Sequence, residues 1–282
     1  MQEYRKGCIC LDIDGTITAD PYAVPDVVVD YFRSLYKQGW SFLFITGRLY
    51  SFAVKTLGKI DFPYFLALQN GADLLWMPEK TLLAREYLSS TVIPILEEMC
   101  QDRTEDFLLY AGLDRGDFCY YRPERFSPKM QEHLRIVQTL SHKSWQTRKD
   151  FFFEPEEFFS LIKFLGSKEE VFHLQAILEK RKEFAVSSVK DPLSTEIYLN
   201  LITSPLVDKG NTLKKMRSFF SEGTLFIAAG DDFNDVPMLQ EADLSIVMKT
   251  AHPSIWEHAD ILAESAKECG IIAALAQAIN QE

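Results

Sequence analysis

The sequence lacks several features that each mark a class of protein. Its five cysteines are scattered and form no CxxC pair, which disfavours a zinc site or a redox motif. No hydrophobic run is long enough to span a bilayer, and no secretory signal is visible, because aspartates interrupt the apolar run that follows Lys6. We therefore expect a cytoplasmic protein with reduced thiols and no membrane partner.

Positive charge is also scarce. The chain carries 30 Lys and Arg against 41 Asp and Glu, which gives a net charge of -11 at pH 7. Nonspecific nucleic-acid binding needs a basic surface, so we expect no nucleic-acid partner. No GxGxxG turn follows a predicted strand, which excludes a nicotinamide dehydrogenase. The hydrophobic share of 47% is ordinary for a globular protein with a sizeable core.

The segment Cys8–Ile17 combines an apolar run with two acidic residues. The continuous run predicts a strand buried on both faces of a parallel sheet. It stops at Asp12 and Asp14, whose side chains point the same way on a strand, and Gly15 then allows a sharp turn. Two like charges at this place need a nearby cation or a raised pKa. A strand followed by an ordinary polar turn is the alternative reading.

Helix and strand alternate in both flanks of the chain. Tyr22–Gly39 has apolar residues at helical spacing, Trp40–Ile45 reads as a buried strand, and Leu49–Leu57 as a helix. This βαβ pattern predicts a parallel sheet with right-handed crossovers. It returns near Leu206, and Leu225–Ala229 is a further predicted strand.

The middle of the chain has a different texture. Phe and Tyr are dense, Phe107–Leu113 and Phe118–Arg122 are predicted to pair as a hairpin, and Glu86–Asp102 is predicted to be helical. We therefore predict an α/β fold, a Rossmann-like doubly wound parallel sheet, into which an α+β domain is inserted. The predicted boundaries are residues 1–84 and 202–282 for the sheet domain, and residues 85–201 for the inserted domain.

Polar residues gather where four of these segments end. We expect four loops to end strands at one edge of one sheet, which is where ligands bind in open α/β sheets. Taken alone, Thr46 reads as a helix cap and Lys209 as a surface lysine, and acidic residues suit the first turn of a helix. A chance coincidence of all four loops is the weaker hypothesis. The loops carry Asp12 with Asp14, Thr46, Lys209, and Asp231 with Asn234 and Asp235.

Several motifs together carry a family resemblance. They are DIDGT (Asp12–Thr16), ITGR (Ile45–Arg48), the DKG lysine (Lys209), GDDFND (Gly230–Asp235), and QNGA near Asn70. The set resembles the haloacid dehalogenase superfamily of phosphohydrolases. The inserted domain is similar in position to the type IIB cap of the Cof-like subgroup. Asp232 departs from the family pattern, in which a small residue is common, and adds a negative charge.

The resemblance implies a role for each acidic residue. Asp12 would be the nucleophile that forms an aspartyl-phosphate, and Asp14 the general acid and base. Mg²⁺ would be the cofactor, because it prefers oxygen ligands and bridges phosphates. Its ligands would be Asp12, the backbone carbonyl of Asp14, and Asp231. Asp235 would orient Lys209 or a metal-bound water.

The same resemblance implies which residues bind the substrate. These are Thr46, Gly47, Arg48, Lys209 and Asn234, with Thr46 and Lys209 also serving catalysis. The predicted function is a Mg²⁺-dependent phosphatase whose partner is a small phosphorylated metabolite, with a sugar phosphate as the expected substrate. A phosphotransferase or phosphomutase that uses the same intermediate is one alternative, and a non-catalytic binding protein on the same scaffold is another.

Overall fold

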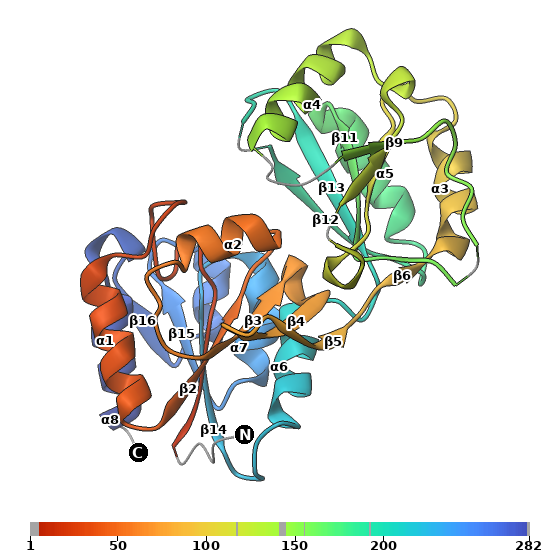
Figure 1. Cartoon of the computed structure of the whole chain (residues 1–282). Helices are drawn as coiled ribbons and strands as arrows, with labels where there is room; N and C mark the ends of the chain where they lie inside the picture. Colours follow the sequence, from red (N-terminus) through yellow and green to blue (C-terminus); the bar gives the residue numbers. More distant parts are fainter. Residues whose placement is uncertain (1–5, 117, 141–144, 155, 192, 281–282) are drawn as a thin grey trace. The chain divides into compact units, whose positions relative to one another are not determined.

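The structure is a computed structural model that describes residues 6–116, 118–140, 145–154, 156–191 and 193–280 (Figure 1). The chain divides into two compact units. The first contains Met1–Ala84 and Asp208–Glu282, and the second is Arg85–Val207. The chain therefore leaves the first unit once and returns to it once.

An eight-stranded sheet forms the centre of the first unit, in the order β16-β15-β14-β1-β2-β3-β4-β5. Neighbouring strands from β16 to β3 are parallel, and β4 is antiparallel to β3. The strands are β1 (Gly7–Leu11), β2 (Trp40–Ile45), β3 (Tyr64–Leu68), β4 (Asp73–Met77), β5 (Thr81–Arg85), β14 (Leu225–Gly230), β15 (Leu244–Met248) and β16 (Ile261–Ala263).

The strand order confirms the predicted doubly wound α/β fold. From the central strand β1 the chain proceeds to β2 and β3 on one side, and later to β14, β15 and β16 on the other. The order reverses between β1 and β14, so the loops that leave these two strands diverge at their carboxyl ends. Such a switch point is where open α/β sheets bind ligands.

Helices cover both faces of this sheet, which explains why β1 and β2 are buried along their whole length. Phe42 and Phe44 of β2 pack against Phe32 of α1, with ring centroids 5.2 and 6.2 Å apart. Leu43 and Ile45 point to the other face and join a cluster that includes side chains of α6 and α7. The helices of the unit are α1 (Asp26–Lys37), α2 (Tyr50–Thr56), α6 (Lys209–Arg217), α7 (Val236–Glu241) and α8 (Ile271–Asn280), with the short 3-10 helices η1 (Gln69–Gly71), η5 (Phe233–Asp235), η6 (Pro253–His258) and η7 (Ala266–Glu268).

The second unit contains a six-stranded sheet in the order β12-β13-β11-β7-β8-β9. A two-stranded sheet pairs β10 with β6, and one face of the larger sheet buries a cluster of apolar side chains from α3 and α5. The elements are β6 (Leu88–Ser89), η2 (Ser90–Val92), α3 (Ile93–Cys100), β7 (Phe107–Tyr110), η3 (Leu113–Arg115), β8 (Cys119–Tyr121), η4 (Pro123–Arg125), α4 (Pro128–Leu140), β9 (Trp145–Thr147), β10 (Phe158–Phe159), β11 (Leu161–Gly166), α5 (Lys168–Leu178), β12 (Ala185–Lys190) and β13 (Tyr198–Thr203).

Two details of this unit differ from the sequence analysis. The predicted helix Glu86–Asp102 is wrong over its first half, because β6 and η2 precede α3. A sequence boundary between residues 201 and 202 would cut β13, which pairs with β11 and β12 of the second unit. The second unit therefore continues to Val207.

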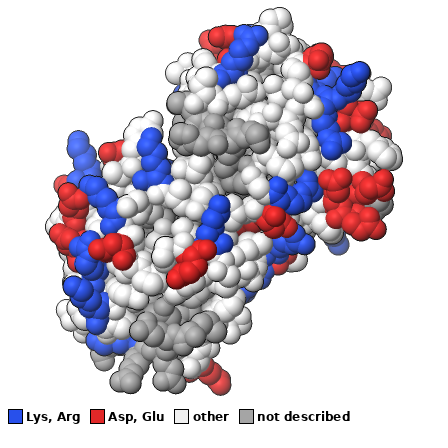
Figure 2. All heavy atoms as spheres, viewed as in Figure 1, with Lys and Arg blue, Asp and Glu red and all other residues white. Residues whose placement is uncertain are grey.

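Two further observations concern the surface and the helices. On the face shown in Figure 2, Lys and Arg are interspersed with Asp and Glu and do not gather in one basic patch.

Among the residues that the structure describes, no helix has the length and apolar character needed to cross a lipid bilayer.

Candidate active site

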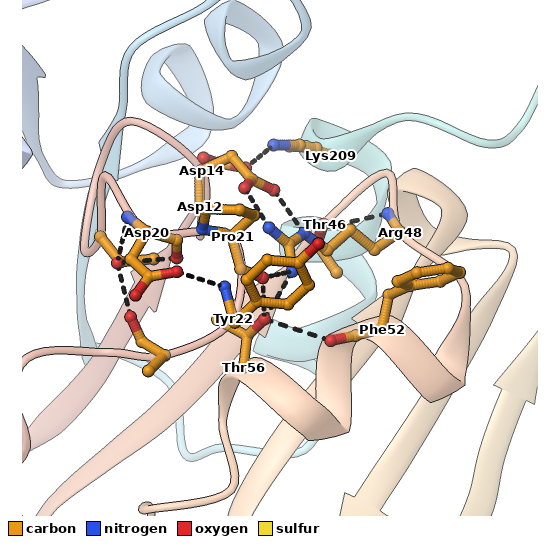
Figure 3. Close-up of polar contacts among 12 residues, drawn as sticks. Asp12, Asp14, Asp20, Pro21, Tyr22, Thr46, Arg48, Phe52, Thr56 and Lys209 are labelled. Atoms are coloured by element: carbon orange, nitrogen blue, oxygen red, sulfur yellow. Dashed lines mark hydrogen bonds and ion pairs between the residues drawn. The ribbon is translucent and has the colours of Figure 1, made fainter. Parts of the chain in front are cut away.

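Asp12 lies immediately after β1 and is held in a buried position. Its backbone N–H donates to the carbonyl of Ala229, at 3.0 Å, which extends the pairing with β14. The Lys209 ammonium donates to Asp12 Oδ1 at 2.5 Å (Figure 3). It also donates to Asp235 Oδ1 at 2.6 Å. The Lys209 side chain is only 1% exposed. One buried cation therefore lies between two carboxylates.

Lys209 reaches this position from a helix and not from a strand end. It is the first residue of α6, whose N-cap Asp208 accepts a hydrogen bond from the N–H of Asn211 at 2.7 Å. The preceding strand, β13, belongs to the sheet of the second unit. The expectation that Lys209 follows a strand of the first sheet is therefore wrong, although its side chain does join the site.

Asp235 fixes the loop that follows β14. Its side chain is fully buried, and Oδ2 accepts the backbone N–H groups of Asp231 and Asp232 at 2.9 and 3.0 Å. Gly230 has no side chain, and this is required, because a Cβ there would lie 2.4 Å from that of Asp235. Asp235 therefore connects the loop to Lys209.

The loops after β1 and β14 meet at Gly15 and Asp231. Gly15 has a φ of +78°, and a Cβ at this position would lie 2.0 Å from Asp231 Oδ2. Thr16 Oγ1 approaches Asp231 Oδ1 at 3.5 Å. Only glycine satisfies both the left-handed backbone and this close approach.

Three carboxylates at this place can offer oxygen atoms to one cation. Ligand atoms of Asp12, Asp231 and Asp235 lie within 4.8 Å of one another. Asp235 already accepts hydrogen bonds from Lys209 and from two backbone N–H groups, whereas Asp231 accepts only the long contact from Thr16 among the described residues. Asp12 and Asp231 are therefore the side chains best placed to bind Mg²⁺, which prefers oxygen ligands.

Burial and mutual repulsion shift the charges of this group. Burial raises the pKa of Asp12 well above its usual range; Lys209 opposes this, and Asp235 and Asp231 add to it. For Lys209 burial favours the neutral amine, but Asp12 and Asp235 outweigh it and raise the pKa of the ammonium. Burial, followed by the charges of Asp235 and Asp232, raises the pKa of Asp231 to about 7.

The raised pKa of Asp231 predicts that, without metal, the protein loses stability as the pH rises from about 5 to about 8. Up to about pH 7 the folded protein retains a proton that the unfolded chain has released, so a higher pH favours unfolding. The expected loss is on the order of 2 kcal/mol. Urea unfolding in EDTA at the two pH values measures it. The control is Asp231→Asn, which should remove this part of the pH dependence; an unchanged slope in the variant would contradict the prediction.

Asp14 lies at the exposed side of the site and has a different partner. Its two carboxylate oxygens accept hydrogen bonds from the guanidinium of Arg48, with Nε at 2.7 Å from Oδ2 (Figure 3). Strand β1 ends at Leu11, so the strand alternation assumed for Asp12 and Asp14 does not apply to them. The Asp14 carboxylate is also not among the three that lie within reach of a single cation.

Thr46 follows β2 directly, as predicted. Its Oγ1 accepts the backbone N–H of Arg48 at 3.1 Å, which leaves the hydroxyl proton free to be donated to a ligand. The carbonyl of Thr46 accepts the N–H of Asn70 at 2.8 Å. A Cβ at Gly47 would meet the amide of Asn70 at 3.5 Å, which is ordinary contact.

Asn234 is joined to the same place by Asn70, a residue of the QNGA motif. Asn234 Nδ2 donates to Asn70 Oδ1 at 3.3 Å. Asn70 has a left-handed backbone, with φ 60°, which Asn tolerates better than most residues. Asn-Gly is a turn signal that agrees with this conformation, but it does not reveal the contact with Asn234.

Comparison with known proteins decides the family. The family model of haloacid dehalogenase-like hydrolases matches residues 9–275 of this chain. The chain belongs to this family. The resemblance seen in the sequence motifs is thereby confirmed. The motif residues of the hydrolase lie in its first unit, at strand ends, in the segments that follow them and at the start of α6.

Individual relatives of this haloacid dehalogenase-like hydrolase are distant. A 5-amino-6-(5-phospho-D-ribitylamino)uracil phosphatase of Bacillus subtilis is 22% identical, over 95% of this chain and 93% of its own. Two solved structures share the fold. A haloacid dehalogenase-like hydrolase of Bacteroides thetaiotaomicron has a TM-score of 0.76 at 19% identity and covers 97% of this chain and 100% of its own. A subclass IIB sugar phosphatase of the superfamily has a TM-score of 0.72 at 14% identity, with the same coverage.

Proposed function

We propose that this hydrolase is a Mg²⁺-dependent phosphatase that acts on a small phosphorylated metabolite through an aspartyl-phosphate on Asp12. The observation that carries the proposal is the buried Asp12 carboxylate, bonded to the Lys209 ammonium and close to Asp231 and Asp235. A carboxylate alone would repel a phosphate dianion. The neighbouring ammonium and a cation held by the acidic group reduce that repulsion.

The residues that would hold Mg²⁺ are Asp12, Asp231 and the backbone carbonyl of Asp14. When bound, the ion supplies charge neutralisation between nucleophile and phosphoryl group. The all-oxygen donor set fits this ion.

The chain's own residues would carry out two transfers. In the first, an Asp12 oxygen bonds to phosphorus, the bond from phosphorus to the ester oxygen breaks, and Asp14 gives that oxygen a proton. In the second, water attacks the same phosphorus, its proton passes to Asp14, and the bond from phosphorus to Asp12 breaks. Inorganic phosphate leaves and both aspartates return to their initial state.

Lys209, Thr46 and Asn234 would bind the transferred phosphoryl group. Lys209 supplies positive charge, and the Thr46 hydroxyl still has a proton to donate. The proposal of a sugar phosphate as substrate draws on relatives, since one structural neighbour is a sugar phosphatase and one relative acts on a phosphoribityl compound.

A panel of phosphate esters tests the proposal. With Mg²⁺ present we expect release of inorganic phosphate from sugar phosphates, and EDTA should lower the rate by about 10²-fold or more, because charge neutralisation of the transition state is lost. Restoration by added Mg²⁺ is the control for irreversible damage. Transfer of the phosphoryl group to a sugar acceptor without phosphate release would favour a phosphotransferase. No turnover of any ester would favour a binding protein.

A further inference from the structure

The guanidinium of Arg48 is almost fully occupied by the protein itself. An arginine has five N–H donors. Nε and Nη2 donate to the two oxygens of Asp14, and Nη1 donates to the carbonyl of Pro21 at 2.7 Å and to Thr56 Oγ1. Four of the five donors are thus used within the described part of the chain.

Arg48 is the fixed member of its pair with Asp14. The Arg48 side chain is 15% exposed and that of Asp14 is 53% exposed. Thr56, on α2, accepts from Arg48 and also donates to the Pro21 carbonyl at 2.7 Å. The backbone of Arg48 is held as well, because its carbonyl accepts the N–H of Gln69 at 3.2 Å. The close-up in Figure 3 shows Pro21, Thr56 and Asp14 around this one guanidinium.

We infer that Arg48 is a positioning residue for Asp14 and not a ligand of the phosphoryl group. The inference departs from the sequence analysis, in which the family resemblance implies that Arg48 binds the substrate. Two parallel N–H···O bonds from a fork fix the plane of a carboxylate, and a single bond does not. Each Asp14 oxygen keeps a further lone pair that can face the reacting atoms. The inference rests on the proposed function, in which Asp14 moves the proton.

The dependence on the leaving group distinguishes positioning from phosphate binding. An alkyl phosphate needs a proton on its leaving oxygen, whereas p-nitrophenyl phosphate releases a stable anion and needs little help. The ratio kcat/KM reports the steps up to leaving-group departure, so slow hydrolysis of the aspartyl-phosphate does not affect it. A residue that acts through Asp14 changes kcat/KM for the alkyl ester and spares the aryl ester. A phosphate ligand changes both equally.

The experiment compares Arg48→Gln, Asp14→Asn and the double variant, with glycerol phosphate and p-nitrophenyl phosphate as probes. We expect R48Q to lower kcat/KM by about 30-fold for the alkyl ester and by less than about 3-fold for the aryl ester. The double variant should be no slower than D14N alone, because Arg48 has no catalytic carboxylate to orient once Asp14 is changed. Circular dichroism and thermal unfolding of each variant show whether it is folded.

Thr56→Val provides a second test that leaves both charged groups in place. It removes one acceptor of Arg48 and should lower kcat/KM for the alkyl ester about 3-fold, with the aryl ester unchanged. Equal losses on both esters, or multiplicative effects of R48Q and D14N, would overturn the role of Arg48 while leaving the phosphatase intact. A wild type that hydrolyses neither ester in Mg²⁺ would instead overturn the proposed function, and this inference with it.

Discussion

Asp12→Asn is expected to lower phosphate-ester hydrolysis by about 10⁴-fold or more, which corresponds to about 5.5 kcal/mol of activation free energy. The amide retains the size of the carboxylate but is not a competent nucleophile towards phosphorus. The substitution also removes one carboxylate ligand of the proposed Mg²⁺. Phosphate release at saturating Mg²⁺ measures the loss.

The matched control for this prediction is Asp232→Asn. Asp232 belongs to the same acidic loop as Asp231, and its Oδ1 accepts the N–H of Phe233 at 2.7 Å, a bond that asparagine also accepts. The control removes one negative charge beside the site without touching the nucleophile, so we expect a change of less than about 5-fold. Equal losses in the two variants would show that charge alone matters and that Asp12 is not the nucleophile.

Lys209→Met is expected to destabilise the metal-free protein by about 3–5 kcal/mol, because it leaves two buried carboxylates without their counter-ion. The Lys209 side chain is 1% exposed, and its Asp12 and Asp235 partners are 9% and 0% exposed. Urea unfolding in EDTA measures the effect. The loss should be smaller near pH 5 than near pH 8, because protonation of the carboxylates then relieves their repulsion.

Two further variants show whether the buried cation is the cause. Lys214→Met, on the same helix α6, removes an ammonium that is 57% exposed and pairs with Glu241 at 2.9 Å, and should cost less than about 1 kcal/mol. Lys209→Met combined with Asp235→Asn should recover part of the lost stability, since one uncompensated charge is removed. A double variant that is less stable than Lys209→Met would contradict this account.

Sequence reasoning predicts best the segments whose burial and position follow from their own residues. Strand β2 has the bounds Trp40–Ile45 in both the prediction and the structure, because all its residues except Ser41 are apolar and both faces of the sheet are covered. The position of Thr46 directly after it followed from the same pattern. Motif spacing likewise indicated the loop Gly230–Asp235, where a glycine and a buried aspartate are in contact.

The partners of polar side chains were less accessible to sequence reasoning. Nothing in the local sequence shows that Arg48 donates to Asp14, Pro21 and Thr56, because these residues meet only when the first sheet and α2 are in place. The same is true of Asn70 and Asn234, which are 164 positions apart. The position of Lys209 was misjudged for a related reason, since the strand before it pairs in another sheet.

The central place of β1 has a consequence for synthesis on the ribosome. β1 pairs with β2 on one side and with β14 on the other, and Leu11 lies opposite Ala229. At about 5–20 residues per second, the second neighbour emerges roughly 10–40 s after the first strand has been made. Until then one edge of the nascent strand has no native partner. A chaperone that shields apolar nascent segments should therefore raise the yield of active enzyme more than it raises the yield of the second unit, Arg85–Val207, in its folded form.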